Sequence, residues 1–343
     1  DVKKEFFATE AQYITEKDAD ADAMLIGQYL KAFGIDVSLY AGNENLPFLL
    51  NQDRPEMVIN LVDSVRGDET LASTIPGILR LLNIPFTGAN VIGLSLDTNK
   101  FLVKKLLRQN GIPVPNFQLI YSPEDDIDET LRFPVISKLN AIHGAVEITH
   151  DAVSENRTHL RDRLRFLIQT YHQPVLVEEF IPGREITAIL LEGTNRSIYM
   201  AEKVFLHGEG NYIFTTFENQ WLSRGDSVFH YQIFSDEVLE EYIHRAFDTT
   251  RMFDYGKFDV RLDPSGQYFF IDTNCNPAFG PKELDVALSA ILDLYGISFE
   301  ELLKSLVLNT VRNASNKNRM PIQNDLGAVL AAWSRNGKNP GKN

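Results

Sequence analysis

Three oxygen-bearing side chains near the C-terminal end, Asp259, Asp272 and Asn274, have the types and spacing of a divalent-metal site. Carboxylate and amide oxygens are hard ligands that suit Mg²⁺, which takes few protein ligands and leaves its other positions to water and phosphate oxygens. A solvated polar face on an ordinary hairpin would carry the same residue types. Both explanations stay open on this stretch alone.

A β-hairpin must position these ligands. Strands over Lys257–Leu262 and Tyr268–Thr273 flank the sequence Asp-Pro-Ser-Gly, whose proline and glycine suit a tight turn. If Leu262 lies opposite Gln267, the two aspartates become diagonal neighbours on one face. Diagonal neighbours are roughly 7–8 Å apart, which is close enough for both to approach one ion.

The composition is that of a soluble globular protein with two or three domains. The chain has 343 residues, of which 44% are hydrophobic and 23% charged, and its net charge is −14. This charge argues against nucleic acid and against an anionic membrane surface as partners. No apolar run approaches the ~20 residues of a membrane span, and the charged N-terminus does not resemble a signal peptide. The single cysteine, Cys275, excludes an internal disulfide and favours the cytoplasm.

Strand and helix patterns alternate over residues 1–95, which predicts an N-terminal domain with a parallel sheet. Neither the dinucleotide fingerprint G-x-G-x-x-G nor the phosphate loop G-x-x-x-x-G-K-[ST] occurs, so any nucleotide site must use other parts. The expected strands are Phe6–Ala8, Asp36–Tyr40 and Met57–Val62, and the expected helices are Ala19–Phe33, Pro47–Asn51 and Thr70–Leu82.

Residues 96–179 predict a small α+β domain, and residues 180–315 predict a domain with a mixed or antiparallel sheet. A polar tail, 316–343, follows them. The smaller domain is expected to contain helix Asp97–Gln109, strand Asn116–Tyr121, strand Phe133–Lys138, loop Leu139–Val146, helix Ser154–Tyr171 and strand Pro174–Phe180. The larger domain is expected to contain strands Glu185–Leu191, Ser197–Val204 and Tyr212–Phe217, helix Ser235–Met252, the hairpin, and helices Lys282–Tyr295 and Ser298–Leu308.

Five segments, in this order, resemble an ATP-grasp ligase of the D-alanine–D-alanine ligase type. They are IPFTG with LDTNKFLVKK, FPVISK with its loop, VEEFIPGREIT, YGKFDVRLD and FFIDTNCNPAF. The resemblance covers about residues 20–312 and implies a three-domain fold, α/β and α+β. It also implies ATP and Mg²⁺, with two ions and with Mn²⁺ as a substitute, and a carboxylate activated as an acylphosphate that an amine then attacks.

The resemblance also implies roles for single residues. Lys100 and Lys138 would hold the nucleotide phosphates, although lysines on a helix face are by default solvated. The segment Glu178, Glu179, Phe180 and Ile181 would read adenine, and Glu185 would bind the ribose hydroxyls. Asp259, Asp272 and Asn274 would bind the metal, and the catalytic group would comprise Lys257, Arg261, Trp221 and His143.

The departures from the family pattern concern the substrate side. In place of the N-terminal G-G-x-S-x-E turn, only Glu16 is available to hold an ammonium group, and Glu283 replaces a serine that binds a carboxylate. Gln220-Trp221 replaces a lysine–aromatic pair, and Lys257 replaces an arginine that stabilises an oxyanion. The closing loop has His143 where the family has serines. Glu16, Gly280 and Glu283 are therefore the expected substrate residues.

These departures predict a ligase that joins an amino acid to a second small molecule, either a second carboxylate or an enol-type acceptor, for example in amino-acid or natural-product tailoring of the mycosporine type. An acid at Glu283 would repel a carboxylate and favour an amine or hydroxyl. An ordinary D-alanine–D-alanine ligase and a non-catalytic ATP-binding protein are the alternatives. A homodimer is expected from the family alone.

Overall fold

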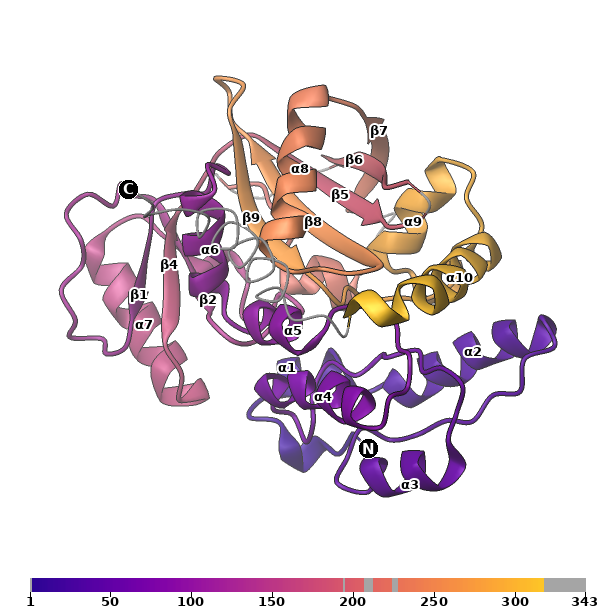
Figure 1. Cartoon of the computed structure of the whole chain (residues 1–343). Helices are drawn as coiled ribbons and strands as arrows, with labels where there is room; N and C mark the ends of the chain where they lie inside the picture. Colours follow the sequence, from indigo (N-terminus) through magenta and orange to yellow (C-terminus); the bar gives the residue numbers. More distant parts are fainter. Residues whose placement is uncertain (1, 194, 207–211, 224–227, 318–343) are drawn as a thin grey trace, which may run out of the picture.

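A computed structural model describes residues 2–193, 195–206, 212–223 and 228–317, with side chains to 311. A helical N-terminal part lies below two antiparallel sheets in Figure 1, and each sheet carries its own helices. In the described residues no helix has the length and apolarity to cross a membrane. The predicted tail, 316–343, lies almost wholly outside them.

The N-terminal part contains helices and extended segments in place of the predicted parallel sheet. The expected strands Asp36–Tyr40 and Met57–Val62 are not strands in the described chain, and Phe6 ends a 3-10 helix. One parallel bridge, Val58 with Phe86, is formed. It does not extend, because the next amide, that of Asn60, donates to the Thr87 hydroxyl at 2.9 Å. The elements here are η1 (Lys4–Phe6), α1 (Glu10–Ile14), α2 (Ala19–Ala32), α3 (Leu46–Asp53), η2 (Glu69–Ser73) and α4 (Thr74–Leu81).

A four-stranded antiparallel sheet with order β1-β4-β2-β3 follows. Helix α7 covers one face, since its leucines at 160, 164 and 167 share a core with the sheet valines. The predicted β–loop–β–α–β order is confirmed. The elements are α5 (Val91–Asp97), α6 (Lys100–Gln109), β1 (Phe117–Ile120), β2 (Val135–Leu139), η3 (His150–Ala152), β3 (Val153–Ser154), α7 (Arg157–Tyr171) and β4 (Val175–Glu179).

The second sheet has five antiparallel strands in the order β7-β6-β5-β8-β9. Helix α8 packs on one face, and helices α9 and α10 pack on the other. The elements are β5 (Arg184–Leu191), β6 (Ser197–Phe205), η4 (Glu218–Leu222), β7 (Phe229–Phe234), α8 (Glu237–Thr249), β8 (Tyr255–Leu262), β9 (Tyr268–Asn274), η6 (Lys282–Leu284), α9 (Ala287–Leu294) and α10 (Phe299–Lys317).

The predicted strand Tyr212–Phe217 is wrong, and the strand Phe229–Phe234 was missed. Backbone groups of the first segment bond outside any sheet ladder. The Arg261 guanidinium donates to the carbonyl of Ile213 at 3.0 and 3.1 Å, and the amide of Phe217 donates to Ile148 at 2.8 Å.

The β8–β9 hairpin forms, but its predicted register is wrong. Gln267 belongs to the turn, because its amide donates to the Asp263 carboxylate at 2.8 Å and its carbonyl accepts from the Asp263 amide. Leu262 therefore pairs with Tyr268. A β-bulge then leaves Ile271 unpaired, and beyond it Asp259 lies directly opposite Asp272.

Several helices begin later than predicted, and two predicted helices are divided. Helix α6 begins at Lys100, because the Asn99 side chain caps it by accepting the amide of Leu102. The predicted Thr70–Leu82 helix divides into η2 and α4, and the predicted Lys282–Tyr295 helix divides into η6 and α9.

Candidate active site

A cleft of about 2450 Å³ lies between the N-terminal part and the two sheets. The polar ends of β8 and β9, the loop after β2 and helix α6 all border it. The predicted phosphate, metal and closing-loop residues line this one cleft. The segments that carry them lie far apart in the sequence.

The two aspartates of the hairpin meet across neighbouring strands. Asp259 pairs with Asp272, and Lys257 pairs with Asn274, so the four polar side chains lie on the same face of the hairpin, with the Phe258–Thr273 pair between them on the other face. The Thr187 hydroxyl donates to Asp259 at 2.8 Å, and the Lys257 ammonium forms an ion pair with the same carboxylate. The hydrogen bond from Thr187 and the ion pair with Lys257 together fix the Asp259 carboxylate, which lines the cleft.

Positive charges surround Asp272. Burial alone would raise the pKa of its carboxyl group, but the lysines at 100 and 138 are the first of several cations that hold this pKa below its usual value. Asp272 is therefore ionised over the physiological pH range. A divalent cation would find a carboxylate there without having to displace a proton.

Glu178 forms ion pairs with two lysines. Its side chain is 0% exposed and forms ion pairs with Lys104 at 2.8 Å and Lys138 at 3.0 Å. Burial would raise the pKa of Glu178, but these two ammonium groups lower it. Both lysines also donate to the carbonyl of Ile271, the residue that the bulge leaves unpaired, at 3.0 Å. Glu178 thus fixes the lysines that border the phosphate side, and its carboxylate is not free to read adenine as predicted.

Glu179 points away from its predicted ligand. Its carboxylate accepts two hydrogen bonds from the Arg132 guanidinium, at 3.2 and 2.9 Å, and one from Asn116 at 3.1 Å. At this end of β4 only backbone groups and the Phe180 ring remain for a nucleotide base. That ring packs against Phe214 at 5.7 Å between centroids.

Glu185 is already saturated. It accepts from Lys203 at 2.9 Å, from the Thr215 hydroxyl at 2.5 Å and from Arg261 at 3.1 Å. Burial would raise the pKa of Glu185, but the two cations hold it far below its usual value. A ribose hydroxyl, as predicted here, would have to share the Glu185 carboxylate with these three donors.

Arg261 lines the cleft, but its guanidinium is committed to several partners. It is 3% exposed, and it also donates to the carbonyls of Ile181 at 3.0 Å, Gly183 at 3.1 Å and Ile213. These contacts join β8 to the hinge at 181–183 and to the 212–217 segment. These contacts favour a positioning role for Arg261 over the predicted catalytic one.

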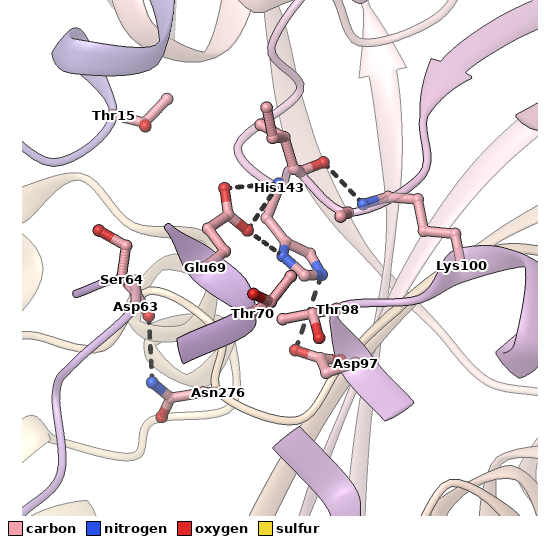
Figure 2. A network of polar contacts seen from close by, with 12 residues as sticks. Thr15, Asp63, Ser64, Glu69, Thr70, Asp97, Thr98, Lys100, His143 and Asn276 are labelled. Carbon is pink, nitrogen blue, oxygen red and sulfur yellow. Dashed lines mark hydrogen bonds and ion pairs between the residues drawn. The ribbon is translucent and has the colours of Figure 1, made fainter. Parts of the chain in front are cut away.

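The closing loop is held against the N-terminal part (Figure 2). The His143 amide donates to Glu69 at 3.0 Å, its ring Nδ1 lies 2.5 Å from the same carboxylate, and Nε2 lies 3.7 Å from Asp97. Burial and Lys100 lower the pKa of His143, but the two acids outweigh them and raise it. Lys100 also donates to the carbonyl of Ile142 at 2.7 Å, so this predicted phosphate ligand also fixes the loop.

Trp221 closes the loop from the other side. Its indole N–H donates to the carbonyl of Gly144 at 2.7 Å. Gly144 has φ +68, and an added Cβ would lie 2.7 Å from the Thr15 methyl carbon, so only glycine fits this close approach. Trp221 contacts the loop and not a reacting atom, which favours a positioning role.

The predicted substrate residues do not all reach the cleft. Glu16 lines it and accepts from the Ser64 hydroxyl at 2.5 Å, and burial raises its pKa to about 7. Glu283 lines it too, and the Tyr29 hydroxyl donates to it at 3.3 Å. Gly280 is buried and is not among the residues that line the cleft, and a Cβ there would lie 2.3 Å from the Leu284 side chain.

Sequence reasoning missed several residues of the site. Lys104 had a usable signal, because it lies one helical turn after Lys100 on the same face. Asp97 stands inside a quoted motif, but its pairing with His143 depends on the fold. The other missed residues are Asp63, Glu69, Thr187, Lys203, Thr215 and Asn276.

The donor set fits a hard divalent cation beside a polyphosphate. Asp259, Asp272 and Asn274 bring two carboxylates and one amide oxygen to one face of the hairpin. Lys100, Lys138 and Lys257 supply cations around them. In the described chain, no three His, Cys, Asp or Glu side chains are grouped as a metal site.

A family model described as the D-Ala–D-Ala ligase C-terminus matches residues 106–308, which is more than half of the 343 residues. The chain belongs to the D-alanine–D-alanine ligase family. Membership makes it an ATP-grasp ligase of the class that forms C–N bonds, with ATP and Mg²⁺ as its cofactors.

Relatives and solved structures agree with this family. The uncharacterized protein y4sG of Sinorhizobium fredii is 29% identical over 228 residues, which cover 64% of this chain and 65% of that protein. The D-alanine–D-alanine ligase of Gloeobacter violaceus is 25% identical over 289 residues, which cover 81% of this chain and 89% of that protein. The crystal structure of the Bacillus anthracis D-alanine–D-alanine ligase complexed with ATP has a TM-score of 0.65 at 17% identity. The match covers 87% of this chain and 94% of that one. At that identity the structure supports the shared fold.

Proposed function

We propose that this ligase joins the carboxylate of an amino acid to the amine of a second small molecule that carries no carboxylate at its far end. The observation that carries the proposal is Glu283, an acid that lines the cleft and accepts a hydrogen bond from Tyr29. An acid at this place repels an acceptor carboxylate and favours a hydroxyl or a second amine. A role in amino-acid or natural-product tailoring fits an acid at this place better than a cell-wall dipeptide does.

The reaction has two steps. A carboxylate oxygen of the first substrate attacks the γ-phosphorus of ATP, the bond to the β-phosphate oxygen breaks, and ADP leaves. The acceptor nitrogen then attacks the acyl carbon of the acylphosphate, its C–O bond breaks, and phosphate leaves as the amine loses a proton. Exclusion of water protects the intermediate from hydrolysis between the steps.

The residues divide these tasks by charge. Asp259, Asp272 and Asn274 would hold Mg²⁺, which would neutralise the charge that develops on the transferred phosphoryl group. Lys100 and Lys138 would contact the phosphates.

The closing loop would exclude water. The contacts of His143 with Glu69 and of Trp221 with Gly144 support its closure over the phosphates.

The test is ADP and phosphate release from Mg-ATP across a panel of L- and D-amino acids, with and without amines, amino alcohols and diamines. We expect release that needs one carboxylate donor and one acceptor without a carboxylate. Glu283→Ser should shift preference toward amino acids as acceptors, and Glu237→Ser, an exposed acid on α8, is the control. An unchanged acceptor profile in the first variant would contradict the role of Glu283.

The names of the relatives favour a second function. The protein of Gloeobacter violaceus is a D-alanine–D-alanine ligase. Release with D-alanine alone, sensitive to D-cycloserine, would establish that function for this chain. Tight ATP binding with no release under any pairing would instead favour a non-catalytic ATP-binding protein.

A further inference from the structure

We propose that Asp63 anchors the ammonium group of the acceptor substrate and that Asn276 positions Asp63 for this task. The proposal rests on the ligase function proposed above, and it names the part of the cleft that receives the attacking amine. Neither residue has a role in the sequence motifs. Both lie in the network shown in Figure 2.

Asp63 and Asn276 join two ends of the chain at the cleft. The Asn276 side-chain amide donates to Asp63 Oδ1 at 3.1 Å across 213 residues of sequence. Asn276 comes two residues after Asn274, the proposed metal ligand that ends β9. Asp63 lies in the extended segment that leads to η2. An amine held by Asp63 would thus be next to the chain segment that carries the metal site.

A buried phenol fixes the orientation of the Asn276 amide. The Tyr255 hydroxyl donates to Asn276 Oδ1 at 3.0 Å, and Tyr255 is 1% exposed. Burial raises the pKa of this phenol far above its usual value, so it remains a donor. With the amide oxygen taken, the NH₂ group points toward Asp63, whose carboxyl oxygen accepts from it.

This arrangement holds one oxygen of Asp63 and leaves the other to the cleft. Asp63 is exposed toward the cleft, and among the described residues it makes no second hydrogen bond. Asp63 opens into the cleft and not to bulk solvent, and the resulting loss of hydration is the main cause that raises its pKa to about 7, with the nearby charge of Glu69 adding to it. A cationic partner is therefore the group that this carboxylate lacks.

The first test compares Asp63→Asn and Asn276→Leu with wild type in steady-state ligation, using the amine that supports wild-type turnover. A lost charge-assisted hydrogen bond predicts that KM for the amine rises at least about tenfold in each variant. The KM for ATP should stay within about twofold, since neither residue contacts the phosphate lysines. Asp53→Asn is the matched control, because Asp53 also lines the cleft and accepts one side-chain hydrogen bond, in its case from the Tyr40 hydroxyl.

A second readout separates anchoring from a structural role. Hydroxylamine is a small neutral amine that traps acylphosphates, so it needs no ammonium anchor. Hydroxamate formation from donor, ATP and hydroxylamine should fall far less in Asp63→Asn than amine-dependent turnover does. Tyr255→Phe should raise the amine KM more weakly than Asn276→Leu, because it frees the amide to rotate without removing it.

Three outcomes decide the proposal. A selective rise in the amine KM, with hydroxamate formation largely kept, supports it. Equal losses in both assays, or an unchanged amine KM in Asp63→Asn, would overturn it. Absence of acceptor-dependent release in the wild type would instead refute the proposed function itself.

Discussion

Asp259 and Asp272 lie directly opposite each other on β8 and β9 because Ile271 bulges out of the ladder between them. The bulge has two effects. It brings the carboxylates closer than diagonal neighbours would be, and it leaves the Ile271 carbonyl to Lys104 and Lys138. One backbone irregularity therefore builds both the metal face and the adjoining lysine pair.

The first prediction concerns Asp272. Asp272→Asn should lower ligand-dependent ADP release at least about 100-fold, because it removes a charged ligand from the metal face. The melting temperature should change little. Asp126→Asn, an exposed acid outside the cleft, is the control. Wild-type turnover in Asp272→Asn would remove this residue from the metal site.

The second prediction distinguishes two lysines that share one acid. Lys138→Ala should weaken ATP binding roughly 10- to 100-fold, as expected for a lost charge-assisted contact to phosphate. Lys104→Ala should act mainly on stability, because its donors are committed to Glu178 and to the carbonyls of β9. Calorimetric titration with ATP and urea unfolding measure the two effects. Equal loss of ATP affinity in both variants would contradict the division.

The third prediction concerns the closing loop. Glu69→Ala should release the His143 amide and ring, and amide hydrogen exchange over residues 141–146 should speed up about tenfold or more. Thr70→Ala, at the next residue, should leave exchange unchanged. Unaltered exchange in Glu69→Ala would show that Lys100 and Trp221 hold the loop without it.

The fourth prediction concerns pH. The pKa of Glu16 and of Asp63 is raised to about 7 in the folded chain, from ordinary values of 4.5 and 3.8. The folded state thus binds protons more tightly than the unfolded state, and stability should fall as the pH rises through the window from about 4 to 7. The melting temperature without ligands should be lower at pH 8 than at pH 5. Asp63→Asn should reduce this difference, and an identical difference in the variant would contradict the assignment.

Periodicity and turn chemistry were enough to predict most of the helices and strands around the site. Alternation in FPVISK and PVLVEEF predicts β2 and β4, and the spacing of Leu160, Leu164 and Leu167 predicts α7. The hairpin register was wrong because the Asp263 side chain captures two amides and lengthens the turn by one residue. A local pattern does not reveal a side chain that competes with the ladder.

The contacts that hold the site together were not predictable for a different reason. Glu185 was expected to bind the ribose hydroxyls, but in the structure it forms ion pairs with Lys203 and Arg261 of the neighbouring strands. The spacing of residues along one strand does not show which cations the next strand supplies. The same holds for His143, whose two acids lie in the N-terminal part and in α5.

Lys104 joins both sheets from helix α6, since it pairs with Glu178 on β4 and donates to two carbonyls of β9. This has a consequence for protein engineering by recombination. A hybrid that kept this hairpin but took helix α6 and the four-stranded sheet from a relative would leave the bulge carbonyls without the Lys104 donor unless the transplanted segment carried a lysine and an acid at these two positions. The exchangeable module is therefore the sheet, helix α6 and the hairpin together, and a crossover point between them would separate parts that work only as a set.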